Sequence, residues 1–258
     1  MNKFTAWTRQ RLDRSTPDGW ILTASLIIAG LGLAGFAGVL QGVHETDMIA
    51  AFDKLIGQII IGLRSGGLTA VFEVLTGLAG SRAILLLLGL TAALLYKPPY
   101  RQLPVILLAG AIVEAAIVLI VKVLVARPRP DQAFQLVHET SFSFPSGHTM
   151  AAVVIYGLLA YFIARTVVAS RRWLVFGLWL GFAAGVAVSR IYLGIHYPSD
   201  TLASACLGGA GLSLGLAWTR HHTTGLNPEA FDRHARNRIL MAISITVIAV
   251  VLWRPLFI

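Results

Sequence analysis

The chain has 258 residues, of which 56% are hydrophobic and only 13% charged, and its mean hydropathy is +0.74. A soluble domain carries about a quarter charged residues, so this composition excludes an ordinary soluble protein and indicates an integral membrane protein. The net charge is +9, but the basic residues stand in short clusters between apolar runs, which indicates membrane topology rather than nucleic-acid binding. The one cysteine, Cys206, excludes an internal disulfide bond and a cysteine-based metal site.

Long apolar runs follow one another along the chain, and a helix needs roughly 20 such residues to cross the hydrocarbon core of a bilayer. Six runs are candidates for spans, at 20–42, 68–96, 103–126, 149–164, 173–188 and 201–218. A shorter run at 239–253 is expected to be a seventh span, with a hairpin or an interfacial helix as the alternatives. The sequence therefore predicts an all-α fold, a polytopic membrane helical bundle of six core transmembrane helices plus a C-terminal seventh.

We expect these runs to form a single membrane domain over 1–258. Its parts are a basic cytoplasmic segment at 1–19, the six-helix core at 20–218, and a basic linker with the last apolar segment at 219–258. A secretory signal has a shorter apolar core and a small-residue cleavage site, so we interpret the first apolar run as an uncleaved membrane helix.

Two stretches carry charge among apolar residues. At 44–67, apolar residues recur three to four apart between charged ones, which predicts an amphipathic helix. This helix lies either at the membrane interface or buried across the bundle, and both alternatives stay open. Glu114 lies inside the third span, where an ionisable group is costly and is often functional. We expect a hydrogen-bonded or protonated packing acid instead, because Glu114 is more than about two helical turns from Lys122.

Basic clusters in the short loops predict the orientation of the spans. They precede the first span and follow the second, fourth and sixth, so they share one face if the spans alternate. The positive-inside rule makes that face cytoplasmic. We therefore expect a multi-pass protein of the inner (cell) membrane, with a cytoplasmic N-terminus. The loops around residues 129, 148 and 196 then share the periplasmic or extracellular face.

Polar groups stand at the ends of apolar runs on that opposite face. The first group holds Lys122, Arg127 and Arg129. Arginine offers a planar fork for two phosphate oxygens, and lysine supplies a point charge. A single lysine at a membrane edge also snorkels to lipid headgroups, which is the alternative for Lys122. Pro128 and Pro130 make a continued helix between the lysine and the second arginine unfavourable.

The second group, at 145–148, directly precedes a predicted helix. Ser146 can cap that helix, Gly147 allows a ligand to approach the backbone, and free N–H groups at a helix start favour an anion. The third group holds His196 and Asp200, with Pro198 suited to the first position of the next helix. An aspartate bonded to one ring nitrogen fixes the tautomer and leaves the other nitrogen nucleophilic, although a capping role for Asp200 is the alternative.

Together the groups form the pattern Lys-x6-Arg-Pro, Pro-Ser-Gly-His and Ser-Arg-x5-His-x3-Asp. This pattern resembles the motif set of the type 2 phosphatidic acid phosphatase family, which vanadium haloperoxidases share. The resemblance covers about residues 20–218, and the extra apolar run after Arg220 departs from the family's usual six spans. The matching residues are Lys122, Arg129, Pro130, Pro145, Ser146, Gly147, His148, Ser189, Arg190, His196 and Asp200.

The resemblance implies a role for each motif. His196 is the expected nucleophile, forming a phosphohistidine, with Asp200 orienting it. His148 is the expected general acid, which later activates water. Arg127 is expected to help by its position. The residues expected to hold the phosphoryl oxygens are Lys122, Arg129, Ser146, Gly147 and Arg190. No metal and no cofactor are implied.

The predicted function is therefore hydrolysis of a lipid phosphate monoester or pyrophosphate. Candidate substrates are phosphatidylglycerol phosphate, phosphatidic acid, undecaprenyl pyrophosphate and lipid A phosphate. The expected partner is a membrane lipid rather than nucleic acid, and the oligomeric state stays open. One alternative is a vanadate-dependent haloperoxidase, although those enzymes are typically soluble. The other is a non-enzymatic anion or lipid transporter, which needs no His–Asp pair beside a second histidine.

Overall fold

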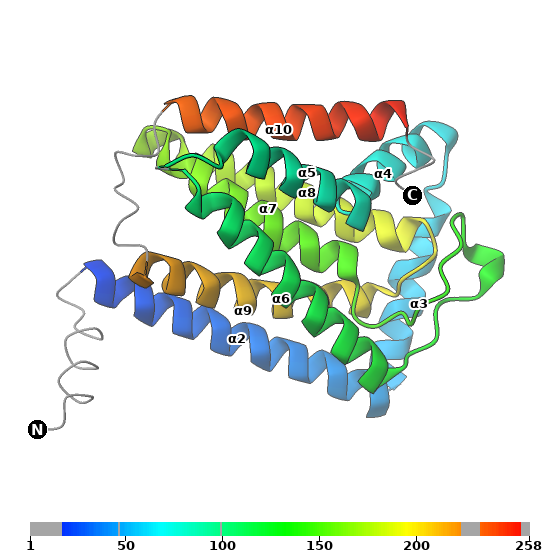
Figure 1. Ribbon diagram of the computed structural model, residues 1–258. Coiled ribbons are helices and arrows are strands. Elements are labelled where there is room, and N and C mark those ends of the chain that lie inside the picture. Colours follow the sequence, from blue (N-terminus) through cyan, green and yellow to red (C-terminus); the bar gives the residue numbers. More distant parts are fainter. Residues whose placement is uncertain (1–16, 46, 99, 223–232, 254–258) are drawn as a thin grey trace, which may run out of the picture.

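The structure is a computed structural model that describes residues 17–45, 47–98, 100–222 and 233–253 (Figure 1). Regular secondary structure in these ranges is helical. The α-helices are α2 (Pro17–Glu45), α3 (Asp47–Gly62), α4 (Gly66–Leu78), α5 (Ser81–Leu95), α6 (Gln102–Val125), α7 (Gly147–Arg165), α8 (Arg172–Tyr192), α9 (Pro198–His222) and α10 (Arg233–Leu252). Two short 3-10 helices, η1 (Gln132–Phe134) and η2 (Ala169–Arg171), lie in the connections.

Within the described ranges, six helices are long and apolar enough to cross a membrane, namely α2, α6, α7, α8, α9 and α10. Helix α7 is buried along most of its length and packs against α6, α8 and α9, so it forms the centre of the bundle. Helices α2 and α6 expose large apolar side chains such as Leu31 and Leu124, which are 69% and 77% exposed. A bilayer would cover these side chains, and the predicted all-α membrane bundle is confirmed.

The predicted second span at 68–96, which Arg82 interrupts in the sequence, consists of two helices rather than one. Helix α4 ends at Leu78, and α5 begins at Ser81 after Gly80 adopts an extended backbone (φ −73°, ψ 156°). The N–H of Ala79 donates to the carbonyl of Thr76, which ends α4 before the polar residues Ser81 and Arg82. The two halves are therefore separate helices, because the extended backbone at Gly80 interrupts the helical dihedral angles.

The amphipathic segment at 44–67 forms α3, which lies across one end of the bundle, nearly perpendicular to the long helices (Figure 1). Asp53 is the buried residue of α3, whereas apolar side chains such as Met48 and Leu55 are 76% and 58% exposed. The exposed apolar face excludes the alternative of a buried helix and favours a helix lying at the membrane interface. Helix α3 meets α4 at a bend of 120°.

The predicted C-terminal span is present as α10, which packs against α5 and α4. It begins at Arg233, six residues before the expected start at residue 239, because its basic first turns are also helical. The expected cytoplasmic segment at 1–19 lies outside the described residues up to residue 16, and the expected linker lies outside them at 223–232.

Candidate active site

The site lies at the end of the bundle that carries α3, and we call this the site end. The last turns of α6 and α8 meet the first turns of α7 and α9 there (Figure 1). Helix α6 stops at Val125 because Ala126 takes a left-handed backbone (φ 48°) and two prolines follow. The N–H of Ser143 then donates to the carbonyl of Arg127 at 2.9 Å, which brings the two ends of the connecting segment together.

The start of α7 is fixed as the sequence predicts. Ser146 is the N-cap, and its Oγ accepts from the N–H of Thr149 at 3.4 Å. The N–H of Ser146 donates to Ser204 Oγ at 2.7 Å, and that hydroxyl donates to the carbonyl of Asp200 at 2.7 Å. Ser204 thus ties the start of α7 to the start of α9. Gly147 is the first residue of α7.

The turn between α8 and α9 requires one glycine. Gly194 has φ +76°, and a Cβ there would lie 2.0 Å from the carbonyl oxygen of Phe134, so no other residue fits. The N–H of His196 returns to the carbonyl of Arg190 at 3.3 Å. Helix α9 then begins at Pro198, as predicted. This turn brings Arg190 and His196 to one side of the site.

His196 and Asp200 form the expected pair. Asp200 Oδ2 lies 3.4 Å from His196 Nδ1, and it also accepts from the N–H of Tyr197 at 2.8 Å and from Ser143 Oγ. His196 Nε2 lies 3.3 Å from Nη1 of Arg129, which can only donate. The contacts therefore favour the tautomer with a proton on Nδ1 and a lone pair on Nε2.

Burial lowers the pKa of His196 to about 3, against the opposing hydrogen bond with Asp200. The imidazole is 3% exposed and is neutral at physiological pH. A neutral ring whose Nε2 carries a lone pair and no proton is the form that can attack phosphorus.

Two arginines from different motifs share one carboxylate. Arg190 Nη2 donates to Glu139 Oε1 at 3.1 Å, and Arg129 Nη2 lies 3.6 Å from Glu139 Oε2. Arg190 also donates to Thr76 Oγ1 at 2.9 Å, while its Nε is buried without a partner among the described residues. Although burial works against it, the two arginines hold the pKa of Glu139 below its usual range. The arginines therefore converge on a single anion.

Lys122 and His148 complete the cluster. The Nζ of Lys122 donates to the carbonyl of Phe142, so this lysine is turned toward the site rather than snorkelling along the membrane. His148 lies in the first turn of α7, half-buried, and has charge interactions with the other site residues. These are Arg190, His196, Arg129 and Lys122. Ser189 instead donates to the carbonyl of Val186 within its own helix, at 2.6 Å.

The guanidinium of Arg127 is paired with carboxylates of the protein. Its Nη1 donates to Asp200 Oδ1 at 2.6 Å and its Nη2 donates to Asp53 Oδ2 at 2.7 Å. Burial opposes the charge, yet Asp200 and Asp53 raise the pKa of Arg127 above its ordinary value. The sequence analysis assigned no site role to Asp53, Glu139 or Ser143, because each stands outside the motifs.

Among the residues that the structure describes, no three His, Cys, Asp or Glu side chains are grouped so that they could hold a metal ion. The site instead carries the cations Lys122, Arg129 and Arg190, and cations attract an anion. A phosphoryl group matches both the planar donors of the arginines and the lone pair of His196.

Comparisons with known proteins identify the family of the chain. A profile of the PAP2 superfamily matches residues 103–224. The chain is 31% identical over 174 residues to phosphatidylglycerophosphatase B of Bacillus subtilis (strain 168). This match covers 66% of this chain and 84% of that protein. It is 35% identical over 131 residues to decaprenylphosphoryl-5-phosphoribose phosphatase of Mycobacterium tuberculosis (strain ATCC 25618 / H37Rv), which covers 48% of this chain and 64% of that one.

A solved structure has the same fold. The crystal structure of a transmembrane PAP2-type phosphatidylglycerolphosphate phosphatase from Bacillus subtilis matches with a TM-score of 0.71 and 26% identity. The match covers 76% of this chain and 98% of that one. The chain therefore belongs to the PAP2 superfamily and is a membrane-embedded phosphatase of the type 2 phosphatidic acid phosphatase kind.

Proposed function

We propose that this protein hydrolyses the phosphate monoester or pyrophosphate of a membrane lipid through a phosphohistidine on His196. The observation that carries the proposal is the geometry of His196, whose Nδ1 lies 3.4 Å from Asp200 Oδ2 and whose Nε2 lies 3.3 Å from Arg129 Nη1. An anion held by Arg129 and Arg190 would have its phosphorus beside that nitrogen. The names of the relatives add support, since both act on lipid phosphates.

In the first step, the Nε2 lone pair attacks phosphorus while the bond from phosphorus to the lipid oxygen breaks. The leaving oxygen takes a proton from the imidazolium form of His148, which the bound anionic phosphate stabilises, so His148 acts as general acid. In the second step, His148 takes a proton from water, and the resulting hydroxide displaces His196 from phosphorus. Inorganic phosphate leaves, and both imidazoles return to their starting forms.

Charge on the transferring group is met by fixed cations. Arg129, Arg190 and Lys122 would each face phosphoryl oxygens, and the first N–H groups of α7 would add hydrogen bonds. Glu139 holds both arginines when no phosphate is bound, so the substrate must displace its carboxylate. Because these side chains supply the positive charge, the proposed reaction needs no metal ion.

The site end is proposed to face the periplasm or the cell exterior of an inner membrane. The loops at the other end carry the basic clusters, which the positive-inside rule places in the cytoplasm. The exposed apolar side of α3 would keep the site at the bilayer surface, so a lipid could present its headgroup while its chains stay in the membrane.

Phosphate release from detergent-solubilised protein tests the activity. The substrates are phosphatidylglycerol phosphate, phosphatidic acid and a polyprenyl pyrophosphate, each with chelator present. We expect release in chelator, loss of at least about 10⁴-fold in His196→Ala, and no change in the matched variant His138→Ala, whose side chain is exposed. Acid-quenched wild-type protein should carry a ³²P label that His196→Ala lacks.

Three outcomes would count against the proposal. Activity lost to the chelator would contradict the metal-free mechanism, and a labelled His196→Ala variant would contradict the nucleophile. Uptake of the lipid into vesicles without phosphate release would instead favour a transporter. The orientation has its own test, in a Cys206→Ala background. An impermeant thiol reagent outside intact cells should label Gln132→Cys at the site end but not Lys97→Cys at the other end, and the reverse would overturn the sidedness.

A further inference from the structure

The surface helix α3 is joined to the nucleophile pair by a buried chain of charges. Asp53 of α3 binds Arg127 Nη2 at 2.7 Å, and Arg127 Nη1 binds Asp200 Oδ1 at 2.6 Å. Asp200 uses its other oxygen for His196. The guanidinium also stacks over the ring of Tyr197, with 4.1 Å from Cζ to the ring centroid. One arginine thus bridges two carboxylates on different helices.

Asp53 is also bonded to the start of α9. Its Oδ1 accepts from the N–H of Ser199 at 2.8 Å, and its Oδ2 accepts from Ser199 Oγ at 2.6 Å. Ser199 is the second residue of α9, so its N–H is one of the donors that a helix start leaves without an intrahelical partner. A carboxylate from α3 therefore caps the helix turn that carries Asp200.

These bonds tie the guanidinium of Arg127 to other residues of the protein. Nη1 also donates to Ser199 Oγ at 2.8 Å, so both terminal nitrogens are bound to residues of the protein. The side chain of Asp53 is only 4% exposed, and an aspartate is rarely buried so completely without a charged partner. Both carboxylate oxygens of Asp53 and both terminal nitrogens of Arg127 thus have partners, and pairing of this kind lets a buried polar network fix one geometry.

We propose that Asp53 is a positioning residue for the reaction: it holds Arg127 and the first turn of α9 so that Asp200 Oδ2 faces His196 Nδ1. The inference rests on the proposed function. Asp53 touches neither the phosphate nor the imidazole, so it acts through Arg127 and Asp200. Without its charge, Arg127 would pair with Asp200 alone, and Asp200 would then stabilise the positive charge that develops on His196 less well.

The test compares Asp53→Asn with Asp47→Asn, the same substitution at an exposed position of α3. Asparagine keeps the size of the side chain and can still accept from Ser199, but it removes the charge that holds Arg127. We expect kcat to fall on the order of 10- to 100-fold, the size of loss that a small misplacement produces. KM and inhibition by inorganic phosphate should stay within about threefold, because the phosphate ligands are untouched. Asp47→Asn should match the wild type in every measurement.

Two further variants keep the inference testable if Asp53→Asn folds poorly. Asp53→Glu keeps the charge, so its kcat should lie between the wild type and Asp53→Asn. The double variant of Asp53→Asn with Arg127→Gln should lose no more than Arg127→Gln alone, since both act through one contact. A purely structural role would instead lower the melting temperature and the folded fraction in step with kcat.

Several results would overturn the inference while the proposed function survives. The proposed function survives if the wild type is active and His196→Ala is inactive. Under that condition, the inference is overturned if Asp53→Asn keeps the wild-type kcat, or if the losses of the double variant are additive. It is also overturned if Asp53→Glu is no more active than Asp53→Asn. A wild-type chain that releases no phosphate from any lipid would remove the proposed function, and this inference with it.

Discussion

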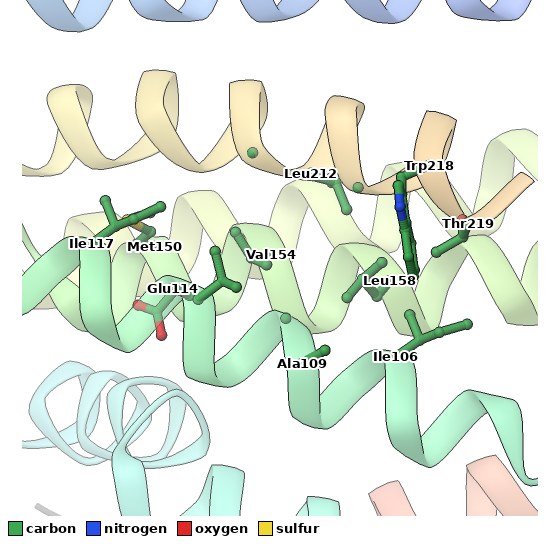
Figure 2. Close-up of a pocket in the computed structure, with 14 residues that line it drawn as sticks. Ile106, Ala109, Glu114, Ile117, Met150, Val154, Leu158, Leu212, Trp218 and Thr219 are labelled. Carbon is green, nitrogen blue, oxygen red and sulfur yellow. The ribbon is translucent and has the colours of Figure 1, made fainter. Parts of the chain in front are cut away.

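Helix α6 and the segment after it carry ionisable groups in two contrasting surroundings. At the site end, Lys122, Arg127 and Arg129 each have hydrogen-bond acceptors from other elements. Glu114 lies eight residues before Lys122, a rise of about 12 Å along a helix. It lines a cavity of about 280 Å³ whose walls are otherwise apolar apart from Thr219 (Figure 2).

The difference between these regions is one of partners rather than of burial. Glu114 is 9% exposed and Asp53 is 5% exposed, so both carboxyl groups are nearly removed from solvent. Asp53 receives three hydrogen bonds, whereas none of the described residues donates one to Glu114. The cavity around Glu114 lies between α6, α7 and α9, which present side chains such as Ile117, Met150 and Val154 (Figure 2). We infer that function is concentrated where charges are paired.

Among the substitutions that test this contrast, the largest effect is expected for the proposed phosphate-binding residue, in Arg190→Ala. The side chain is 2% exposed and binds Glu139 and Thr76, so its loss removes a preorganised donor and leaves Glu139 facing only Arg129. We expect kcat/KM to fall about 10³-fold, the usual cost of removing a donor to a developing oxyanion. Arg171→Ala, an exposed arginine near the other end of α8, is the control and should retain full activity. If kcat/KM fell similarly in both variants, paired charges at the site end would not differ in function from charges elsewhere in the protein.

A second effect concerns stability and comes from His196. Its pKa is about 3 in the folded protein against 6.5 for a free histidine. Between these values the unfolded chain binds the extra proton, so stability falls as the pH drops below about 6.5, by up to about 1.4 kcal/mol per pH unit. The melting temperature of His196→Asn should therefore fall less steeply than that of the wild type between pH 6.5 and 4.5. If the melting temperatures of the two proteins fell equally steeply with pH, His196 would not be buried in its neutral form.

A smaller effect is expected from Glu139, which competes with phosphate for two arginines. Glu139→Gln removes the resident charge, so inorganic phosphate should inhibit about five- to tenfold more strongly, equivalent to about 1 to 1.4 kcal/mol. Asp131→Asn, an exposed carboxylate of the same segment, should leave inhibition unchanged. Weaker inhibition in Glu139→Gln would indicate that the carboxylate helps to bind phosphate rather than competing with it.

The parts of this site that the sequence predicts are those fixed by local backbone chemistry. Ser146 as N-cap, Pro198 as the first residue of α9, and the end of α6 before Pro128 each follow from the preferences of one or two residues. Topology then places the three motifs at one end, because apolar runs alternate across a bilayer. The run at 68–96 is interrupted by Arg82, but hydropathy alone does not show that the chain divides there into two helices at Gly80.

The parts that the sequence does not predict depend on contacts between distant segments. Asp53 precedes its partner Ser199 by 146 residues, and in α3 it looks like any charged residue of an amphipathic helix. Glu139 lies in a connection whose only regular structure is the short helix η1. A single sequence contains no signal for such pairings. The sequence indicates only that partners are needed, without identifying them. The motifs hold more cationic side chains than acidic ones, so the excess cations need either a bound anion or acidic residues from other segments of the chain.

The smallest effect is expected for Glu114→Gln, and it tests the contrast most directly because it is the same change of carboxyl to amide as Asp53→Asn. At Asp53 the change removes a charge that Arg127 pairs with, whereas at Glu114 no described side chain pairs with the carboxyl. We expect kcat/KM to stay within about twofold and the stability to change by less than about 1 kcal/mol, as for a substitution away from any bonded network. Phosphate release and the melting temperature of the two variants, measured side by side, provide the comparison. If Glu114→Gln instead lost as much activity as Asp53→Asn, the apolar cavity would belong to the catalytic machinery, and pairing of charges would not mark where function lies in this bundle.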